Sequence, residues 1–164
     1  TNEATFISPD HWKQLVLPHI TAEVDTLAST GTPIILHSDG NLNRLMDEIV
    51  QLKIWALNPL QRSAHMDMTQ IRARYGHDLC LIGNISTSTT LAYGTPADVE
   101  REALQCLRDV APGGGYIMAP DHSFHSAIPF ENIWAVLNTC RQYGAYPLDM
   151  DAIQSRLEEL EAGS

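Results

Sequence analysis

The sequence predicts an α/β fold built on a parallel sheet, with a helix between each pair of successive strands. Four short apolar runs show no alternation of apolar and polar residues, which is typical of parallel strands covered on both faces. Amphipathic segments separate these runs, and a helical crossover is the compact way to join parallel strands. Neither a linker nor a low-complexity segment divides the 164 residues, so we expect a single domain over residues 1–164.

Each element is expected from its apolar pattern and its capping signals. Ser8 and Pro9 open the first helix, and Pro18 is expected to kink it. Thr95 and Pro96 open the best-signalled helix in the same way. The strands are expected at residues 32–38, 54–60, 78–85 and 114–120. The helices are expected at residues 8–30, 41–53, 66–76, 95–110, 129–144 and 148–164. Both faces of the first strand should be buried, and the last helix should be polar and partly frayed, with a solvated face.

Composition limits the partners and the location that we expect. The 20 acidic and 10 basic residues leave a net charge of −10, which disfavours nucleic acid and an anionic membrane surface as partners. No segment has the length and apolar character of a membrane span. The N-terminal segment does not show the basic stretch followed by an apolar run that is typical of a signal peptide. A soluble cytoplasmic protein is therefore expected. The cysteines are Cys80, Cys106 and Cys140. They show no CxxC spacing, and all three are expected to be buried apolar side chains.

Polar side chains gather where each expected strand ends. In chain order they are His37, Ser38 and Asp39, then Asn58, then Asn84, then residues 121–125, which include Asp121, His122 and His125. Ligands bind at the carboxyl edge of the strands in open parallel sheets and in β/α barrels. We therefore expect these side chains to converge on one rim, where His37 and Asp39, two positions apart, point to the same side.

A structural role is also open to most of these residues. Asp39 can cap a following helix while His37 is held in a polar turn. Asn84 can serve only the turn after its strand, and Asn58 can be structural because it precedes a proline. The two histidines after the last strand can be exposed without any role.

Four segments resemble the C-terminal half of the uroporphyrinogen decarboxylase superfamily. They are "PIILHSDGNL", "GNI" with the following "GTPADVE", "GGGYI", and "PFENI", within a resemblance that runs from about Ser8 to Pro147. The superfamily contains the haem-pathway decarboxylase and the corrinoid-linked methyltransferases of methanogens and acetogens, and its fold is a (β/α)8 barrel of the TIM type. The resemblance therefore implies that this chain is about the C-terminal half of such a barrel.

Half a barrel raises the question of what completes it. TIM barrels typically need about 250 residues, and half of one leaves its end strands unpaired and inner apolar surface uncovered. Four explanations stay open: a shortened chain, a gene fragment, a complementary N-terminal half barrel on a partner chain, or a homo-oligomer.

The methyltransferase branch of the superfamily implies a metal site. Its members carry an H-x-C element at the strand of His37 and a second cysteine after the last strand, and they bind zinc that activates a thiol such as coenzyme M. Here His37 matches, Asp39 replaces the first cysteine, and His122 falls near the second, with His125 close by. The resemblance thus implies that His37, Asp39 and His122 or His125 hold zinc or another divalent metal, although the soft thiolate ligands are missing.

The decarboxylase branch implies a different use of the same rim. It lacks the H-x-C element, and a histidine near the position of His122 or His125 contacts its tetrapyrrole substrate. Its arginine-rich N-terminal segment and its key aspartate lie in the half that this chain does not resemble. The stretch "HSDGN" resembles a further bacterial branch of decarboxylase-like proteins.

The expected function is that of a partial superfamily enzyme, with corrinoid-linked methyl transfer as the first candidate. The expected catalytic residues are His37, Asp39 and His125, and the expected substrate-binding residues are Asn84, His122 and Asn58. Uroporphyrinogen decarboxylation, which removes the carboxylates of acetate side chains, and a non-catalytic half-barrel binding module are the alternatives. The small-molecule partner would be a tetrapyrrole, a corrinoid or another methyl donor or acceptor, and the isolated chain can be inactive.

Overall fold

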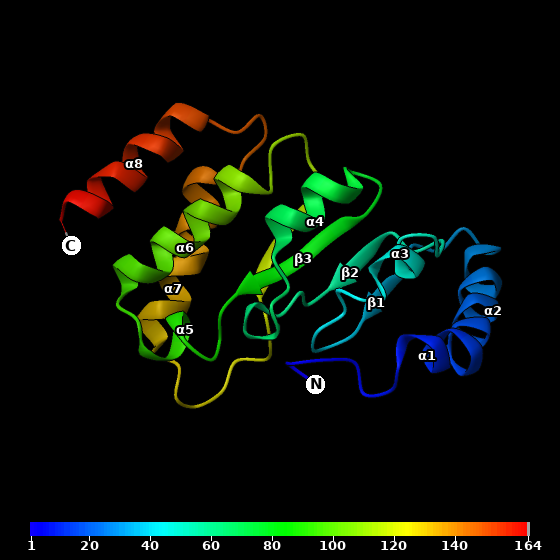
Figure 1. The fold of residues 1–164 in the computed structure, drawn as a ribbon. Coiled ribbons are helices and arrows are strands. Elements are labelled where there is room, and N and C mark those ends of the chain that lie inside the picture. Colours follow the sequence, from blue (N-terminus) through cyan, green and yellow to red (C-terminus); the bar gives the residue numbers. More distant parts are fainter. Residues whose placement is uncertain (164) are drawn as a thin grey trace.

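A computed structural model describes residues 1–163 and contains a four-stranded sheet flanked by helices (Figure 1). The strands are β1 (Ile35–His37), β2 (Ala56–Asn58), β3 (Cys80–Ile85) and β4 (Tyr116–Pro120). The helices are α1 (Pro9–Leu15), α2 (Leu17–Ala28), α3 (Met46–Ile49), η1 (Arg62–Ala64, a 3₁₀ turn), α4 (Met68–Tyr75), α5 (Thr90–Tyr93), α6 (Pro96–Asp109), α7 (Phe130–Tyr143) and α8 (Met150–Ala162). Neighbouring strands pair in parallel, in the order β1-β2-β3-β4. The predicted α/β fold with a parallel sheet is confirmed.

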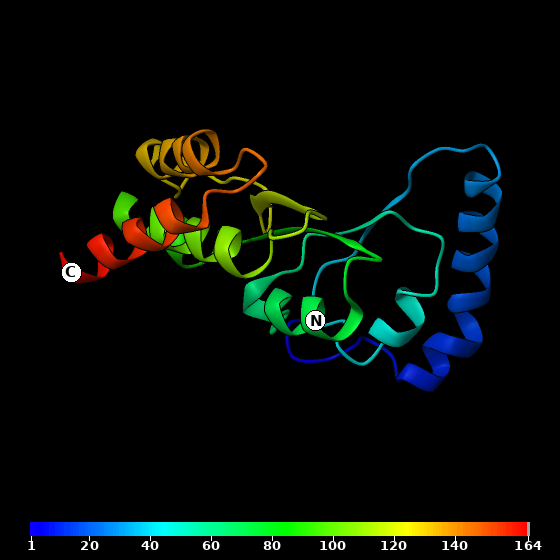
Figure 2. The ribbon, with the colours of Figure 1, turned by 90° about the horizontal axis from the view of Figure 1, so that it is seen from above.

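The expected first helix forms as two helices, α1 and α2, at one end of the molecule (Figure 2). The Ser8 hydroxyl accepts a hydrogen bond from the His11 amide at 3.2 Å and caps α1. The helix is interrupted at Val16. Pro18 lies in the first turn of α2, where its missing N–H removes no helical hydrogen bond. The predicted kink at Pro18 is therefore a full break between two helices.

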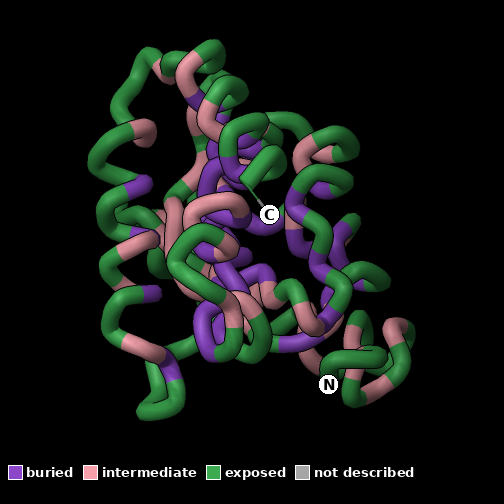
Figure 3. Tube along the Cα trace, turned by 90° about the vertical axis from the view of Figure 1, so that its left-hand side faces the viewer, coloured by how far each residue is buried: buried purple, intermediate pink, exposed green. Residues whose placement is uncertain are grey.

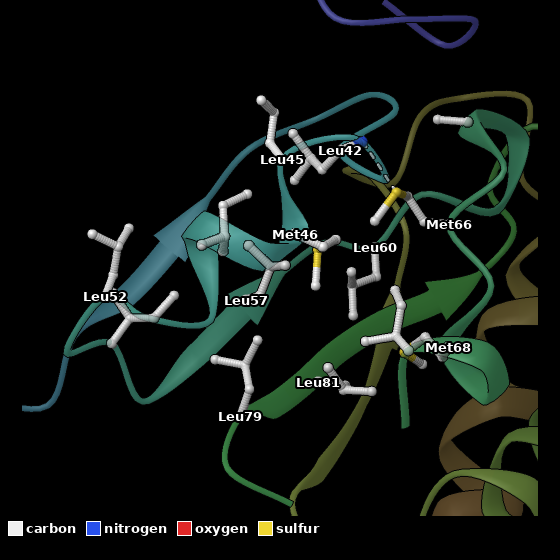
Figure 4. Close-up of a cluster of buried hydrophobic side chains, with 14 of the residues drawn as sticks. Leu42, Leu45, Met46, Leu52, Leu57, Leu60, Met66, Met68, Leu79 and Leu81 are labelled. Atoms are coloured by element: carbon white, nitrogen blue, oxygen red, sulfur yellow. Dashed lines mark hydrogen bonds between the residues drawn. The ribbon is translucent and has the colours of Figure 1, made fainter. Parts of the chain in front are cut away.

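The largest apolar cluster joins the first three strands to the helices outside them. Leu57 of β2 and Leu81 of β3 are almost completely buried, and they lie beside Met46, Leu60 and Met68 (Figure 4). Burying a side chain of this size contributes about 1.5–3 kcal/mol to folding. Because Leu57 and Leu81 pair in register, this cluster fixes the face that β2 and β3 turn towards the helices.

Helix α8 packs against α6, which corrects one expectation. Ile153, Leu157 and Leu160 recur at helical spacing and are buried against Leu104 and Leu107 of α6. The terminal helix is present as predicted, but it is regular to Ala162 rather than partly frayed, because this apolar stripe holds it. In Figure 3 buried positions fill the middle of the molecule and recur at intervals along the outer helices.

The first strand is more exposed than predicted. Ile35 of β1 is 57% exposed, and Ile117 of β4 is 50% exposed. Each of these strands lies at an edge of the sheet and has one neighbouring strand. The expectation that both faces of the first strand are buried is wrong, since the described residues do not cover this side of Ile35.

The helix expected over residues 41–53 is reduced to the four residues of α3. The Asn41 side chain accepts a hydrogen bond from the Asn43 amide at 3.1 Å. Such local bonds compete with helix formation, so the segment begins with turns. Helix α5 was not predicted, because its four residues are too few to show a helical period.

The cysteines differ in burial. Cys106 is buried as predicted, whereas Cys80 is half-buried and Cys140 is exposed on α7. The prediction is therefore wrong for Cys140 and only partly right for Cys80. Among residues 1–163, no helix combines the length and the apolar character that crossing a membrane requires.

Candidate functional site

A pocket of about 350 Å³ opens at the carboxyl ends of β1, β2 and β4. Its walls are His37, Asp39, Asn58, Pro59, Ala119, Pro120, His122 and Ser123. Strands β1 and β4 lie at opposite edges of the sheet, yet both contribute to this one pocket. The sheet must therefore curve as a segment of a barrel wall does, and this curvature brings the ends of distant strands together.

Four of the six residues predicted for the site line this pocket: His37, Asp39, Asn58 and His122. They come together because parallel strands present their carboxyl ends on the same edge. In particular, His37 and Asn58 stand opposite each other in the register of β1 and β2.

The imidazole of His37 is held by Asn58. His37 Nδ1 lies 2.8 Å from Asn58 Oδ1. An amide oxygen only accepts hydrogen bonds, so Nδ1 is the donor and carries a proton. In the neutral ring, Nε2 then has a free lone pair.

Asp39 lies next to that free nitrogen. Asp39 Oδ2 is 3.7 Å from His37 Nε2, and the two side chains are 49% and 65% exposed. Ion pairs this open to water contribute only about 0–1 kcal/mol to stability. The alternative role of Asp39 as a helix cap is not seen, because the next helix, α3, follows Leu45. Both groups are thus open to a ligand.

His122 lines the same pocket but is held in the opposite tautomer to His37. Its Nδ1 accepts a hydrogen bond from the Ser123 amide at 2.9 Å. In the neutral ring the proton is therefore on Nε2, which makes that nitrogen a donor. The pocket thus contains one bare imidazole nitrogen, on His37, and one imidazole N–H, on His122.

His125 points elsewhere. Its Nε2 lies 3.3 Å from the carbonyl oxygen of Thr87, to which it donates. The residue is not part of the pocket wall. The structure therefore separates His125 from His37 and Asp39, with which it was predicted to act.

Asn84 also lies away from the pocket. Gly83 and Asn84 have positive φ angles of 112° and 72°, which ends the alternation of side chains along β3. The Asn84 side-chain amide donates to the carbonyl oxygens of Leu60 and Met66 at 2.8 and 2.9 Å. Asn84 is 5% exposed and fastens the segment between β2 and α4, so the alternative role at the turn fits its position better than the predicted substrate binding.

Asp121 belongs to the cluster predicted at the end of the last strand, but no site role was predicted for it. Asp121 is 1% exposed, and its carboxylate accepts hydrogen bonds from the Arg62 amide at 3.3 Å and from both the amide and the hydroxyl of Thr87 at 2.8 Å. It joins the exits of β2, β3 and β4. The available signal was an acidic residue placed directly after an apolar strand.

The predicted metal set is only partly assembled. Across residues 1–163, no three His, Cys, Asp or Glu side chains are grouped closely enough to hold a metal ion. His37 and Asp39 form a two-group pair, and His122 shares their pocket without joining a ligand group. These residues alone do not fit a three-ligand zinc centre.

Comparison with known proteins agrees with this architecture. The family model of uroporphyrinogen decarboxylase (URO-D) matches residues 2–143. A methyltransferase from Methanosarcina mazei has a similar fold, with a TM-score of 0.72 and 21% identity over 88% of this chain and 40% of that one. That similarity supports a partial fold of the TIM-barrel type.

Curated relatives match about half of the chain or less. The uroporphyrinogen decarboxylase of Histophilus somni (strain 2336) is 28% identical over 81 residues, which are 49% of this chain and 22% of the relative. That of Sodalis glossinidius is 35% identical over 63 residues, or 38% of this chain and 17% of the relative. The matched segments thus span about a fifth of these relatives. Since the family model covers most of the sequence, the chain belongs to the uroporphyrinogen decarboxylase (URO-D) family.

Proposed function

We propose that the pocket at the ends of β1, β2 and β4 is the catalytic site of a URO-D family enzyme, with corrinoid-linked methyl transfer as the first candidate. The observation that carries the proposal is the convergence of His37, Asp39, Asn58 and His122 on one cavity. Structural side chains that merely end strands have no need to converge on a shared cavity. The cytoplasm is the compartment in which we propose that it acts.

The two histidines support acid–base chemistry. His37 Nε2 can accept a proton, and Asp39, 3.7 Å away, stabilises the imidazolium that results. His122 can donate a hydrogen bond from Nε2 to an oxygen or to developing negative charge on the substrate. The same pocket therefore contains both a base and a hydrogen-bond donor.

In methyl transfer the base activates a thiol. His37 takes the proton as the S–H bond breaks, and the thiolate attacks the methyl carbon of a methylated corrinoid. The carbon–cobalt bond breaks and its electron pair stays on cobalt. The fold similarity to a methyltransferase favours this candidate, whereas the curated relatives favour uroporphyrinogen decarboxylation.

A divalent metal is a further proposal for the same pair. The described residues supply His37 and Asp39 as two adjacent ligands, and at least one more would have to come from outside them. When bound, such a metal would lower the pKa of a coordinated thiol or water. No step proposed for His37, Asp39 or His122 depends on it.

The test is to follow demethylation of methylcobalamin by a thiol, and separately loss of carboxylates from uroporphyrinogen. Each assay uses the chain alone and the chain mixed with a polypeptide that supplies the other strands of a URO-D barrel. His37→Gln should abolish whichever activity is present, and His19→Gln, on the exposed side of α2, should leave it unchanged. Full activity in His37→Gln would refute the proposed site, and inactivity in all assays would favour the non-catalytic binding module.

A second proposal concerns what completes the sheet. Within residues 1–163, strands β1 and β4 each have one edge without a pairing strand, and Ile35 and Ile117 are half exposed on them. We propose that a complementary half barrel covers these edges, with a second copy of the chain as the alternative. Light scattering at increasing concentration distinguishes them, because only the second copy yields a dimer of the chain alone. A well-folded monomer that fails to bind the complementary segment would contradict both.

A further inference from the structure

We infer that Asn58 is a positioning residue, whose side-chain oxygen holds His37 in the Nδ1–H tautomer and so leaves Nε2 bare in the pocket. The inference revises the predicted substrate-binding role of Asn58. It rests on the proposed function only in one respect, the assignment of His37 Nε2 as the catalytic base. The tautomer itself can be measured without any activity.

The first support is the register of the two strands. His37 and Asn58 are directly paired in the parallel ladder of β1 and β2, so their side chains leave the sheet from neighbouring positions. The Ser38 amide donates to the Asn58 carbonyl oxygen at 2.9 Å. This backbone bond holds the two strand ends together beside the side-chain contact.

The second support is the direction of the hydrogen bond. Asn58 Oδ1 lies 2.8 Å from His37 Nδ1 and can only accept. Free imidazole side chains favour the Nε2–H tautomer in water, so the bond works against the intrinsic preference. Since an amide does not ionise, this orientation holds at every pH at which the ring is neutral.

The third support is that Asn58 is itself fixed. Pro59, which follows it, lies against Gly83 of β3, where an added Cβ would be 1.8 Å from the Pro59 carbonyl oxygen. The Asn84 amide donates to that same oxygen at 3.3 Å. The exit of β2 is thereby held on β3, and the Asn58 side chain starts from a fixed backbone.

The polarity of the pocket follows from this one bond. With Nδ1 protonated, the nitrogen nearest to Asp39 is the bare one, while His122 presents an N–H. If His37 adopted the other tautomer, both histidines would present N–H groups and the pocket would lose its neutral base. Asn58 therefore determines which nitrogen of His37 faces the pocket without a proton.

The experiment is ¹H–¹⁵N NMR of the histidine rings of the whole chain, at a pH at which the rings are neutral. The couplings of the ring C–H protons identify which nitrogen of each imidazole is protonated, and His37→Gln assigns the His37 signals. We expect Nδ1–H for His37 in the unaltered chain. In Asn58→Leu the His37 signals should move to those of the Nε2–H form, as should be seen already for exposed His19.

Asn58→Asp provides the rescue, because it keeps an accepting oxygen at the same place. Its His37 should remain Nδ1–H, while Asn138→Leu, on the exposed side of α7, should change no histidine tautomer. Nε2–H for His37 in the unaltered chain, or an unchanged tautomer in a folded Asn58→Leu chain, would overturn the inference. If Asn58→Leu does not fold, the unaltered chain and Asn58→Asp still decide it, since each must show Nδ1–H.

Failure of the inference and failure of the proposed function are distinct. If His37 shows the predicted tautomer and Asn58→Leu changes it, but every assay is inactive, then only the proposed function fails. If Asn58→Leu shifts the tautomer and lowers activity as much as His37→Gln, both stand. Full activity with a shifted tautomer would show that Nε2 of His37 is not the base.

Discussion

Asp121 Oδ1 accepts two hydrogen bonds from Thr87, one from the backbone amide and one from the hydroxyl, both at 2.8 Å. Both residues are buried. These two hydrogen bonds connect the end of β4 to the segment that follows β3, although neither residue lines the pocket of the candidate site.

Asp121→Ala should destabilise the chain by about 3 kcal/mol, because the buried amide and hydroxyl of Thr87 lose their acceptor, as does the part-buried amide of Arg62. Urea unfolding followed by circular dichroism measures the free energy of unfolding. Asp78→Ala removes an exposed carboxylate and should change that free energy by less than about 0.5 kcal/mol. A similar, small effect at both positions would mean that the carboxylate of Asp121 does not hold the rim.

Asp98 should make stability sensitive to acid. The Thr95 hydroxyl and amide, together with Arg101, lower the pKa of Asp98 from 3.8 to about 2. A carboxyl whose pKa is lowered on folding stabilises the fold above its unfolded pKa, and this contribution is lost as the pH falls from about 4 to about 2. Asp98→Asn should remove that part of the pH dependence. The free energy of unfolding measured between pH 2 and 5 checks this prediction, with Asp151→Asn on α8 as the control. If this free energy depended on pH in the same way in Asp98→Asn and in the unaltered chain, the prediction would be wrong.

Leu157→Ala should destabilise the chain by about 3 kcal/mol, since it opens a cavity between α8 and α6. The side chain is 1% exposed and packs in the apolar cluster between α8 and α6. Thermal and urea unfolding give the change, and Glu161→Ala on the exposed side of α8 is the matched control. If Leu157→Ala were as mild as the control, α8 would not be part of the folded core.

The chain alone should retain far less than one zinc ion after dialysis. His37 and Asp39 supply two ligands, and structural or catalytic zinc needs at least three from the protein. Elemental analysis of the dialysed chain measures this, with His37→Gln as the reference. One zinc ion per chain that disappears in His37→Gln would show that a third ligand is already in place.

The sequence predicted the part of the site that depends on strand direction. His37, Asp39, Asn58 and His122 follow apolar runs, and the ends of parallel strands meet on one edge, so their convergence needed no knowledge of side-chain contacts. Asn84 fits the same pattern in the sequence but not in the structure. Its positive φ angle depends on the contact of β3 with Pro59, which no local pattern reveals.

The remaining differences arise from tertiary packing. Leu157 looks like one apolar residue in an acidic segment, and its burial depends on the face that α6 offers. Ile35 belongs to an apolar run that resembles a buried strand, but β1 lies at the edge of the sheet and leaves it exposed. The turn at Asn41 was local and could have been predicted, because asparagine side chains commonly bond to the backbone two residues on.

Gly83 is not among the residues that line the pocket, yet the position of Asn58 in the pocket depends on the missing side chain of this residue. An alanine methyl there would stand 1.8 Å from the Pro59 oxygen, whereas ordinary contacts begin at 3.4 Å. The chain at Pro59 would have to retreat by more than an ångström, and it would carry the neighbouring Asn58 amide away from the imidazole. The position of the Asn58 amide beside His37 thus depends on a residue two strands away, where the Pro59 oxygen occupies the place that a side chain would take.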